Sequence, residues 1–175
     1  AAIGLEGIEE GVARQIADLG ELGRKGGALE VVTLKDRAER DFWIAYRDLF
    51  ETMSKSAPNL VVLKANFMLS KVPEMIGAFE GALKAAGLKG ALVCRAGNGI
   101  LYAAIPPGDD PAAGTAAVAS LVARLTDESV KQGGNLDVQR APRAIKEKVG
   151  VWGKSRSGAV LVRRLKEKLD PSGIL

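Results

Sequence analysis

The sequence predicts an α+β fold in which ferredoxin-like β-α-β units are duplicated and extended. Short β-branched runs alternate with stretches whose apolar residues recur every three or four positions, a pattern typical of strands alternating with helices. The turn sequence at 96–99, Ala-Gly-Asn-Gly, separates two apolar runs and predicts an antiparallel hairpin. Together these signals predict a largely antiparallel sheet with helices on one face, followed by two C-terminal helices.

The first part of the chain reads as β-α-β-α. Residues 2–6 are apolar enough for a short strand, and the helical spacing from Ile8 predicts a helix that ends near Leu22. Residues 29–34 are β-branched and apolar, which predicts a second strand. Asp36, with Glu39 three residues later, matches a capping box and predicts one helix reaching Met53.

The middle block reads as β-α-β-β-α-β, the ferredoxin-like order. Gly87 is a candidate for the residue that ends its first helix, and Asp110-Pro111 is a good start for its second. The expected elements are a strand over 59–68, a helix from Ser70 and Pro73, strands over 91–95 and 100–105, a helix ending near Gly133-Gly134, and a strand over 136–139.

The end of the chain is basic and helical. Residues 143–148 predict a short helix, residues 152–158 a glycine-rich loop, and residues 159–169 a last amphipathic helix. Asp170-Pro171 predicts the end of that helix, since proline cannot continue it.

The composition excludes several classes of function. The 175 residues contain no histidine and a single cysteine, so Ser-His-Asp and Cys-His catalysis, an internal disulfide and a transition-metal site are not expected. The net charge is +4, but the basic residues are dispersed, which argues against nucleic-acid binding. No apolar run has the roughly 20 residues that a membrane span needs.

Strand alternation predicts which side chains share the second face of the sheet. If Val61, Leu63, Ala65 and Phe67 pack under the helices, the intervening Lys64 and Asn66 point away from them. Arg95 and Tyr102 lie close to the hairpin turn on opposite strands. A face that bears Lys64, Asn66, Arg95 and Tyr102 suits an anion or a partner domain, and it equally suits a solvated sheet face.

Several short motifs, in their order along the chain, resemble those of the C-terminal domain of FAD-linked oxidases of the vanillyl-alcohol-oxidase type. The chain is most similar to the branch of glycolate oxidase and D-lactate dehydrogenase. Its Lys-rich last helix, Asp170-Pro171 and Ile174-Leu175 match the family's ending, up to the point where Asn-Pro-Gly would follow. The other matching pieces are Gly4-Leu5-Glu6-Gly7 before a helix, Phe42-Trp43 with Arg47, Val72-Pro73-Glu74-Met75, and Gly97-Asn98-Gly99.

One departure from the family pattern narrows the resemblance. Many relatives carry His-x-Gly-Asp-Gly-Asn-x-His in the hairpin, whereas here Arg95 and Tyr102 occupy the two histidine positions. This departure puts metal binding and the usual acid/base role in doubt. It favours the histidine-poor, FAD-binding E-type subunit of bacterial glycolate oxidase over the catalytic D-type subunit.

The resemblance implies that residues 1–175 are a single cap-type domain, with halves of about 1–57 and 58–140 and C-terminal helices over 141–170. It implies an FAD-dependent 2-hydroxy-acid oxidoreductase whose FAD is bound mainly by an N-terminal domain absent from this chain. The cut-looking ends predict that the chain is a piece of that enzyme and is not active in isolation. The expected substrate-binding residues are Arg95, Tyr102, Lys64 and Asn66.

The resemblance also implies partners and a location. The partners are the protein's own FAD-binding domain, other flavin and iron–sulfur subunits of the oxidase, and a small 2-hydroxy acid. The location is cytoplasmic, or peripheral at the inner membrane through the complex. Two alternatives stay open: a non-catalytic domain that docks a subunit of the oxidase complex, and a stand-alone ferredoxin-like ligand-binding domain.

Overall fold

The computed structural model describes residues 1–106, 111–153 and 158–174. The chain divides into two compact units, Ala1–Leu49 and Phe50–Leu175, and each is described by itself below. The expectation of one domain with two related halves stays a prediction.

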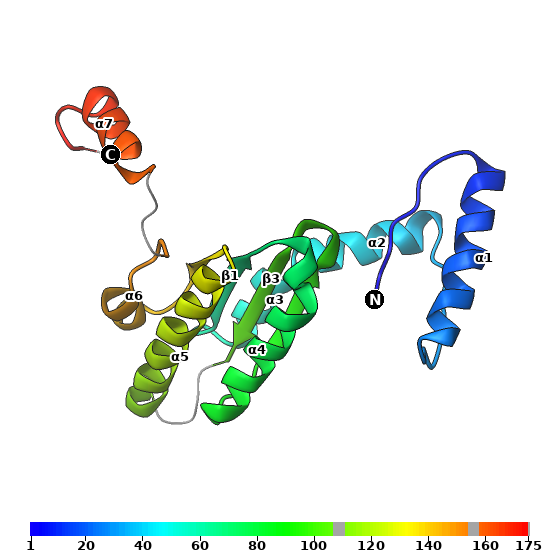
Figure 1. Ribbon diagram of the computed structural model, residues 1–175, viewed down its shortest axis with the longest axis horizontal. Helices are drawn as coiled ribbons and strands as arrows, with labels where there is room; N and C mark the ends of the chain where they lie inside the picture. The colour runs from blue at the N-terminus through cyan, green and yellow to red at the C-terminus, as the bar shows by residue number, and fades with distance from the viewer. Residues whose placement is uncertain (107–110, 154–157, 175) are drawn as a thin grey trace. The chain divides into compact units, whose positions relative to one another are not determined.

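The first unit is helical, with α1 (Glu9–Lys25) and α2 (Asp36–Arg47) as its regular elements (Figure 1). Acidic side chains lie in the first turn of α1 and basic ones in its last turn, an arrangement that complements the helix dipole. The helix predicted from Ile8 is therefore present, and it continues three residues beyond Leu22.

The two strands predicted in this unit, over 2–6 and 29–34, are wrong, because both segments lack regular structure. Their sequences suit extended backbone, but a strand needs a neighbour to accept and donate its ladder hydrogen bonds. In the second segment Leu29 is fully exposed and Val32 is 64% exposed, so neither side chain is buried against a sheet.

The capping box predicted at Asp36 is also wrong. Lys35 is the residue before the helix, no side chain caps its first turn, and Asp36 itself has a left-handed φ of 52°. The carboxylate of Glu39 instead accepts a hydrogen bond from Nε1 of Trp43, at 3.3 Å. Trp43 packs edge-to-face against Phe42 and Tyr46, with ring centroids 5.0 and 5.8 Å away.

The helix predicted to run from Asp36 to Met53 is interrupted at Asp48. There α2 ends and α3 (Leu49–Ser56) begins. The Asp48 carboxylate accepts two hydrogen bonds from the Arg47 guanidinium, at 2.7 and 2.9 Å. Aspartate has a low helix propensity, and the apolar periodicity alone does not reveal the break at this position.

The second unit contains a four-stranded antiparallel sheet in the order β2-β3-β1-β4. This is the strand order of a ferredoxin-like β-α-β-β-α-β block, and the predicted α+β fold class is confirmed. The strands are β1 (Val61–Asn66), β2 (Ala91–Arg95), β3 (Ile100–Ile105) and β4 (Asn135–Arg140), and the two crossovers are α4 (Val72–Ala85) and α5 (Pro111–Lys131).

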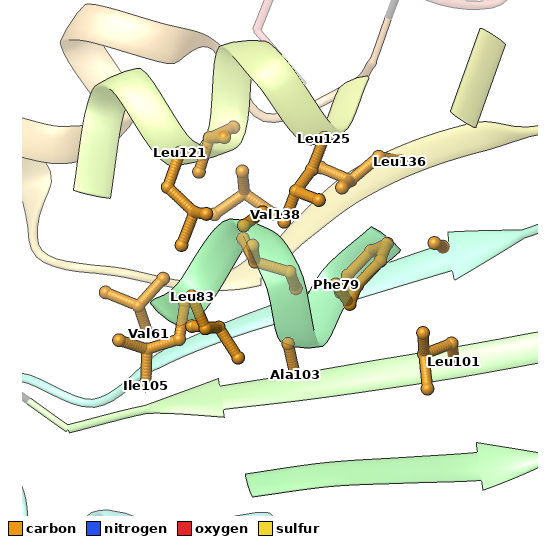
Figure 2. Close-up of a cluster of buried hydrophobic side chains, with 14 of the residues drawn as sticks. Val61, Phe79, Leu83, Leu101, Ala103, Ile105, Leu121, Leu125, Leu136 and Val138 are labelled. Carbon is orange, nitrogen blue, oxygen red and sulfur yellow. The ribbon is translucent and has the colours of Figure 1, made fainter. Parts of the chain in front are cut away.

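The main core lies between this sheet and the two crossover helices (Figure 2). Phe79, Met75 and Leu125 are each at most 1% exposed and face the sheet from α4 and α5. The predicted alternation of β1 is confirmed, since Val61, Leu63, Ala65 and Phe67 all belong to this core. Burial of fully apolar side chains of this size stabilises the fold by about 1.5–3 kcal/mol each.

Cys94 lies on β2 and packs against the edge of this core. Burial raises the pKa of its thiol above the ordinary value. Because the thiolate is the reactive form, we expect the midpoint of the pH profile for Cys94 alkylation to lie above that of free cysteine. The pH profile of iodoacetamide labelling, read by mass spectrometry, tests this. A midpoint at or below that of free cysteine would contradict it.

The hairpin between β2 and β3 has the predicted turn. A short 3₁₀ segment, η2 (Ala96–Asn98), leads to Gly99, whose φ of 63° lies in the left-handed region. The Gly99 carbonyl accepts a hydrogen bond from the Phe67 amide at 2.9 Å, which ties the hairpin to the end of β1.

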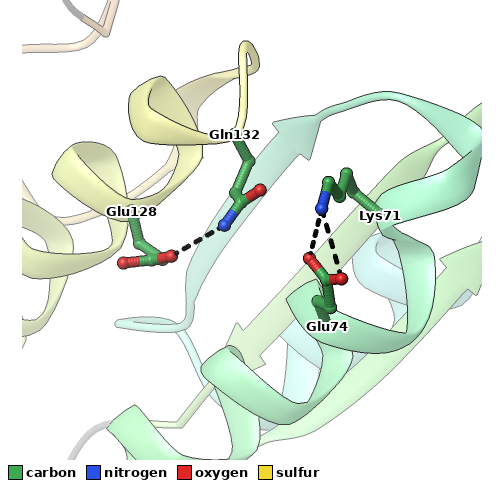
Figure 3. A network of polar contacts seen from close by, with 4 residues as sticks. All are labelled: Lys71, Glu74, Glu128 and Gln132. Carbon is green, nitrogen blue, oxygen red and sulfur yellow. Dashed lines mark hydrogen bonds and ion pairs between the residues drawn. The ribbon is translucent and has the colours of Figure 1, made fainter.

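Polar contacts fasten the helix ends near this side of the sheet (Figure 3). Lys71 is the last residue of η1 (Leu69–Lys71) and donates to both carboxylate oxygens of Glu74, at 3.2 and 2.9 Å. Just after the end of α5, Nε2 of Gln132 donates to Glu128 of that helix at 3.3 Å. The Lys71–Glu74 ion pair is exposed, and a pair of this kind adds little stability.

The C-terminal elements are α6 (Arg143–Val149) and α7 (Ala159–Leu169), as predicted. Asp170 ends α7, with its carboxylate accepting hydrogen bonds from Lys166 at 3.1 Å and from the Ile174 amide at 2.9 Å. The predicted cap at Asp110 and most of the glycine-rich loop lie outside the described residues. Among the helices that the structure describes, none has the length and apolarity to cross a membrane.

Candidate functional site

The four predicted site residues lie on one face of the sheet. Lys64 of β1 is directly opposite Tyr102 of β3, and directly opposed residues in a ladder project to the same side. Ile100 is opposite both Asn66 and Arg95, which places those two side chains on the same face one row nearer the hairpin. This surface is called the polar face below. It is the side of the sheet away from α4 and α5.

Tyr102 is held between two neighbours on the polar face. The Arg95 guanidinium carbon lies 5.6 Å from the centroid of the Tyr102 ring, which is within the range of a cation–π contact. The ring of Phe50 is also close, with its centroid 5.2 Å from that of Tyr102. These contacts restrict Tyr102, so its phenol and the Arg95 cation form one pre-arranged pair.

The polar face is not left uncovered, contrary to the expectation that all helices lie on the other side. A small second core of Leu60, Val62 and Ala104 packs against Phe50, Met53 and Ala57. The helix α3 therefore covers the row of Val62 and reaches Tyr102. The row that contains Asn66 and Arg95 lies beyond these apolar contacts, toward the hairpin.

β4 adds polar residues that the sequence did not single out. Asp137 is opposite Lys64, Asn135 is opposite Asn66, and Arg140 is opposite Val62. The alternation along β4 was the available signal. Leu136 and Val138 belong to the core on the helix side, so the polar residues between them point to the other face.

Trp152 extends the central row of the polar face. It forms an antiparallel bridge with Asp137, and Val151 accepts a hydrogen bond from the Val138 amide at 2.9 Å. Its side chain is 82% exposed. The sequence alone could not place it, because the bridge joins β4 to a segment with no strand pattern.

Hydrogen bonds orient the carboxylate of Asp137 and the guanidinium of Arg140. The Asn135 amide donates to Oδ1 of Asp137 at 2.8 Å, and Arg140 pairs with Glu51 of α3 at 3.5 Å. Arg140 forms this ion pair with Glu51, and the other charged side chains named on this face are the cations Lys64 and Arg95 and the anion Asp137. The polar face is thus cationic toward β2 and rich in acceptors toward β4.

The full length of the chain, residues 1–175, matches the family described as FAD linked oxidases, C-terminal domain. The chain belongs to this family. A comparison with curated proteins finds no match.

Within this FAD-linked oxidase domain the polar face carries cationic, anionic and amide side chains on one side of the sheet. Among the residues that the structure describes, no group of three or more potential ligands could hold a metal ion. The turn at Gly97–Gly99 joins two strands and shapes the hairpin, unlike a dinucleotide-binding turn, which opens a helix.

A separate groove lies on the helix side of β4. It has a volume of about 470 Å³ and an apolar floor that includes Val122, Leu136 and Val138. Thr126, Asp127 and Lys148 also line it. The groove shares no side chain with the polar face, and none of the predicted site residues lines it.

Proposed function

We propose that this domain is the substrate cap of an FAD-dependent 2-hydroxy-acid oxidoreductase of the glycolate oxidase type. In this proposal the polar face receives the substrate carboxylate, and an FAD-binding domain of the same protein supplies the flavin. The observation that carries the proposal is the pairing of Lys64 with Tyr102 in the β1·β3 ladder, with Arg95 against the same tyrosine ring. The replacement of both hairpin histidines favours the E-type subunit within that group.

The residues of this chain fit the covering of a flavin and its substrate better than the binding of a dinucleotide. The polar face offers side-chain cations and amides on a rigid sheet, which suits a small anion. When bound, FAD supplies the capacity to accept a hydride from the substrate. The domain's own residues bind the substrate, orient it and exclude water.

The side chains have distinct roles in this proposal. Arg95 makes charge-assisted hydrogen bonds to the carboxylate, which are stronger than bonds between neutral groups. Lys64 adds a second cation from the next row of the sheet. The hydroxyl of Tyr102, in the same row as Lys64, donates a neutral hydrogen bond. Asn66 offers an amide one row away. Together they fix the acid end of the substrate and leave its hydroxyl-bearing carbon directed away from the cations.

The decisive experiment is Arg95→Ala in the full-length flavoprotein. We expect the KM for a 2-hydroxy acid such as glycolate or D-lactate to rise about tenfold to a hundredfold, because a hydrogen bond between charged groups contributes about 1.5–3 kcal/mol. Lys84→Ala is the matched control, since it removes one exposed cation from α4, on the far side of the sheet. It should leave KM unchanged.

An unchanged KM and kcat in Arg95→Ala would overturn this proposal. If Lys64→Ala were also silent while variants of the polar face weakened co-purification of another oxidase subunit, the face would instead serve subunit docking. The exposure of Trp152 favours subunit docking as the second function, because exposed aromatic side chains are common at protein interfaces.

A further inference from the structure

The acceptor side of the polar face has no role in holding a carboxylate. Asp137 is opposite Lys64 in the β1·β4 ladder, and Asn135 directs its amide to one oxygen of the Asp137 carboxylate. The second oxygen takes no hydrogen bond from the residues that the structure describes. An anionic acceptor beside a binding site for anions repels the ligand unless the ligand offers it a donor.

We propose that Asp137 accepts a hydrogen bond from the substrate hydroxyl and so selects 2-hydroxy acids over carboxylates that lack this donor. The inference rests on the proposed function, because it places the carboxylate on Arg95 and Lys64. It adds a residue of opposite charge that recognises a different group of the same ligand.

The ladder geometry supports this assignment. Side chains directly opposite one another on neighbouring strands start about 4.5–5.5 Å apart at Cβ. A 2-hydroxy acid carries its hydroxyl on the carbon next to the carboxylate, so one small molecule reaches from Lys64 to Asp137. The hydrogen bond from Asn135 holds the carboxylate of Asp137 in place, and a carboxylate is an acceptor of hydrogen bonds.

The charge arrangement explains the selectivity. A ligand with a hydroxyl donor satisfies Asp137, whereas a simple carboxylate or a 2-oxo acid presents only acceptors to it. Leaving a charged acceptor without its donor, or opposing it with a second acceptor, is costly in a partly dehydrated site. The same arrangement disfavours the 2-oxo product and would promote its release.

Two non-reacting ligands that differ only in the hydroxyl test the proposal. 2-Hydroxyisobutyrate has no hydrogen on its α-carbon and cannot be oxidised, and isobutyrate lacks the hydroxyl. Their dissociation constants for the full-length protein are measured by titration calorimetry. In the unmodified protein we expect tighter binding of 2-hydroxyisobutyrate, by about tenfold or more.

In Asp137→Ala this preference should fall to less than about threefold, through weaker binding of the hydroxy acid and equal or tighter binding of isobutyrate. Asp127→Ala is the matched control, because it removes one exposed carboxylate from α5, on the other side of the sheet. It should keep the preference. Melting temperatures of all variants, measured without ligand, identify any variant that has lost its fold. If Asp137→Ala does not fold, Asp137→Asn takes its place in the test.

The outcomes separate this inference from the proposed function. If Arg95→Ala weakens both ligands and Asp137→Ala preserves the preference, the selectivity role of Asp137 is overturned while the carboxylate site stands. If the unmodified protein binds neither ligand, or if Arg95→Ala affects neither, the proposed function itself fails. If Arg95→Ala weakens both ligands, and Asp137→Ala loses the preference while Asp127→Ala keeps it, the result supports both the carboxylate site and the selectivity role of Asp137.

Discussion

Replacement of Phe79 by alanine is expected to lower the free energy of unfolding by about 3–5 kcal/mol. Phe79 is fully buried in the middle of α4 and is surrounded by the main core (Figure 2). The change removes the transfer free energy of a phenyl ring and leaves a cavity that the sheet and α5 cannot close. The midpoint of urea unfolding, followed by circular dichroism, measures the loss.

Gly81→Ala is the matched control on the same helix. A Cβ at this position meets nothing within 4 Å, and an alanine in a helix is more favourable than a glycine by roughly 0.5–1 kcal/mol. We expect this variant to be slightly stabilised. A Phe79→Ala variant with the stability of the unmodified protein would mean that α4 does not pack on the sheet as described.

The ferredoxin-like block was predictable from the sequence because its local and long-range signals agree. The run around Val61 alternates with period two, and the glycines at 97 and 99 separate the two later apolar runs where a hairpin turn is needed. Each strand of this block also has a partner close in the chain or across one helix. The apolar residues of α4 and α5 lie along one side of each helix, so both helices pack on the apolar face of the sheet.

The leading β-α-β was not predictable, because strand formation depends on a neighbour and sequence periodicity does not name one. Leu29 and Val32 have the composition of a strand, yet they lie exposed in a segment without regular structure. The break at Asp48 was missed as well, because the apolar periodicity continues across the end of α2.

Half of the candidate site followed from alternation within strands, and the other half required the order of the strands. Lys64, Asn66, Arg95 and Tyr102 share a face because of their positions relative to the hairpin. Asp137 joins them only because β4 pairs with β1, which a strand pattern in isolation does not determine. The cover by α3 was missed for the same reason, since Phe50 reads as part of a longer helix.

Gly99→Ala is expected to destabilise the domain by about 2–4 kcal/mol, although it adds only a methyl group. Gly99 has a φ of 63°, a conformation that costs an alanine about 1–2 kcal/mol. The added Cβ would also overlap the carbonyl oxygen of Phe67, so the hairpin would have to move away from the end of β1. Hydrogen exchange of the β1 and β3 amides, together with urea unfolding, measures the effect.

Gly97→Ala makes this test specific, because it adds the same methyl group to the same turn. A Cβ at position 97 meets nothing within 4 Å, and the residue does not have a positive φ. Its substitution should be neutral, or stabilising by about 0.4–1 kcal/mol through a smaller entropy of the unfolded chain. Equal effects at the two positions would show that the turn is not held against Phe67. A large effect at Gly99 alone means that this backbone contact holds the hairpin, which Arg95 enters, against the end of β1.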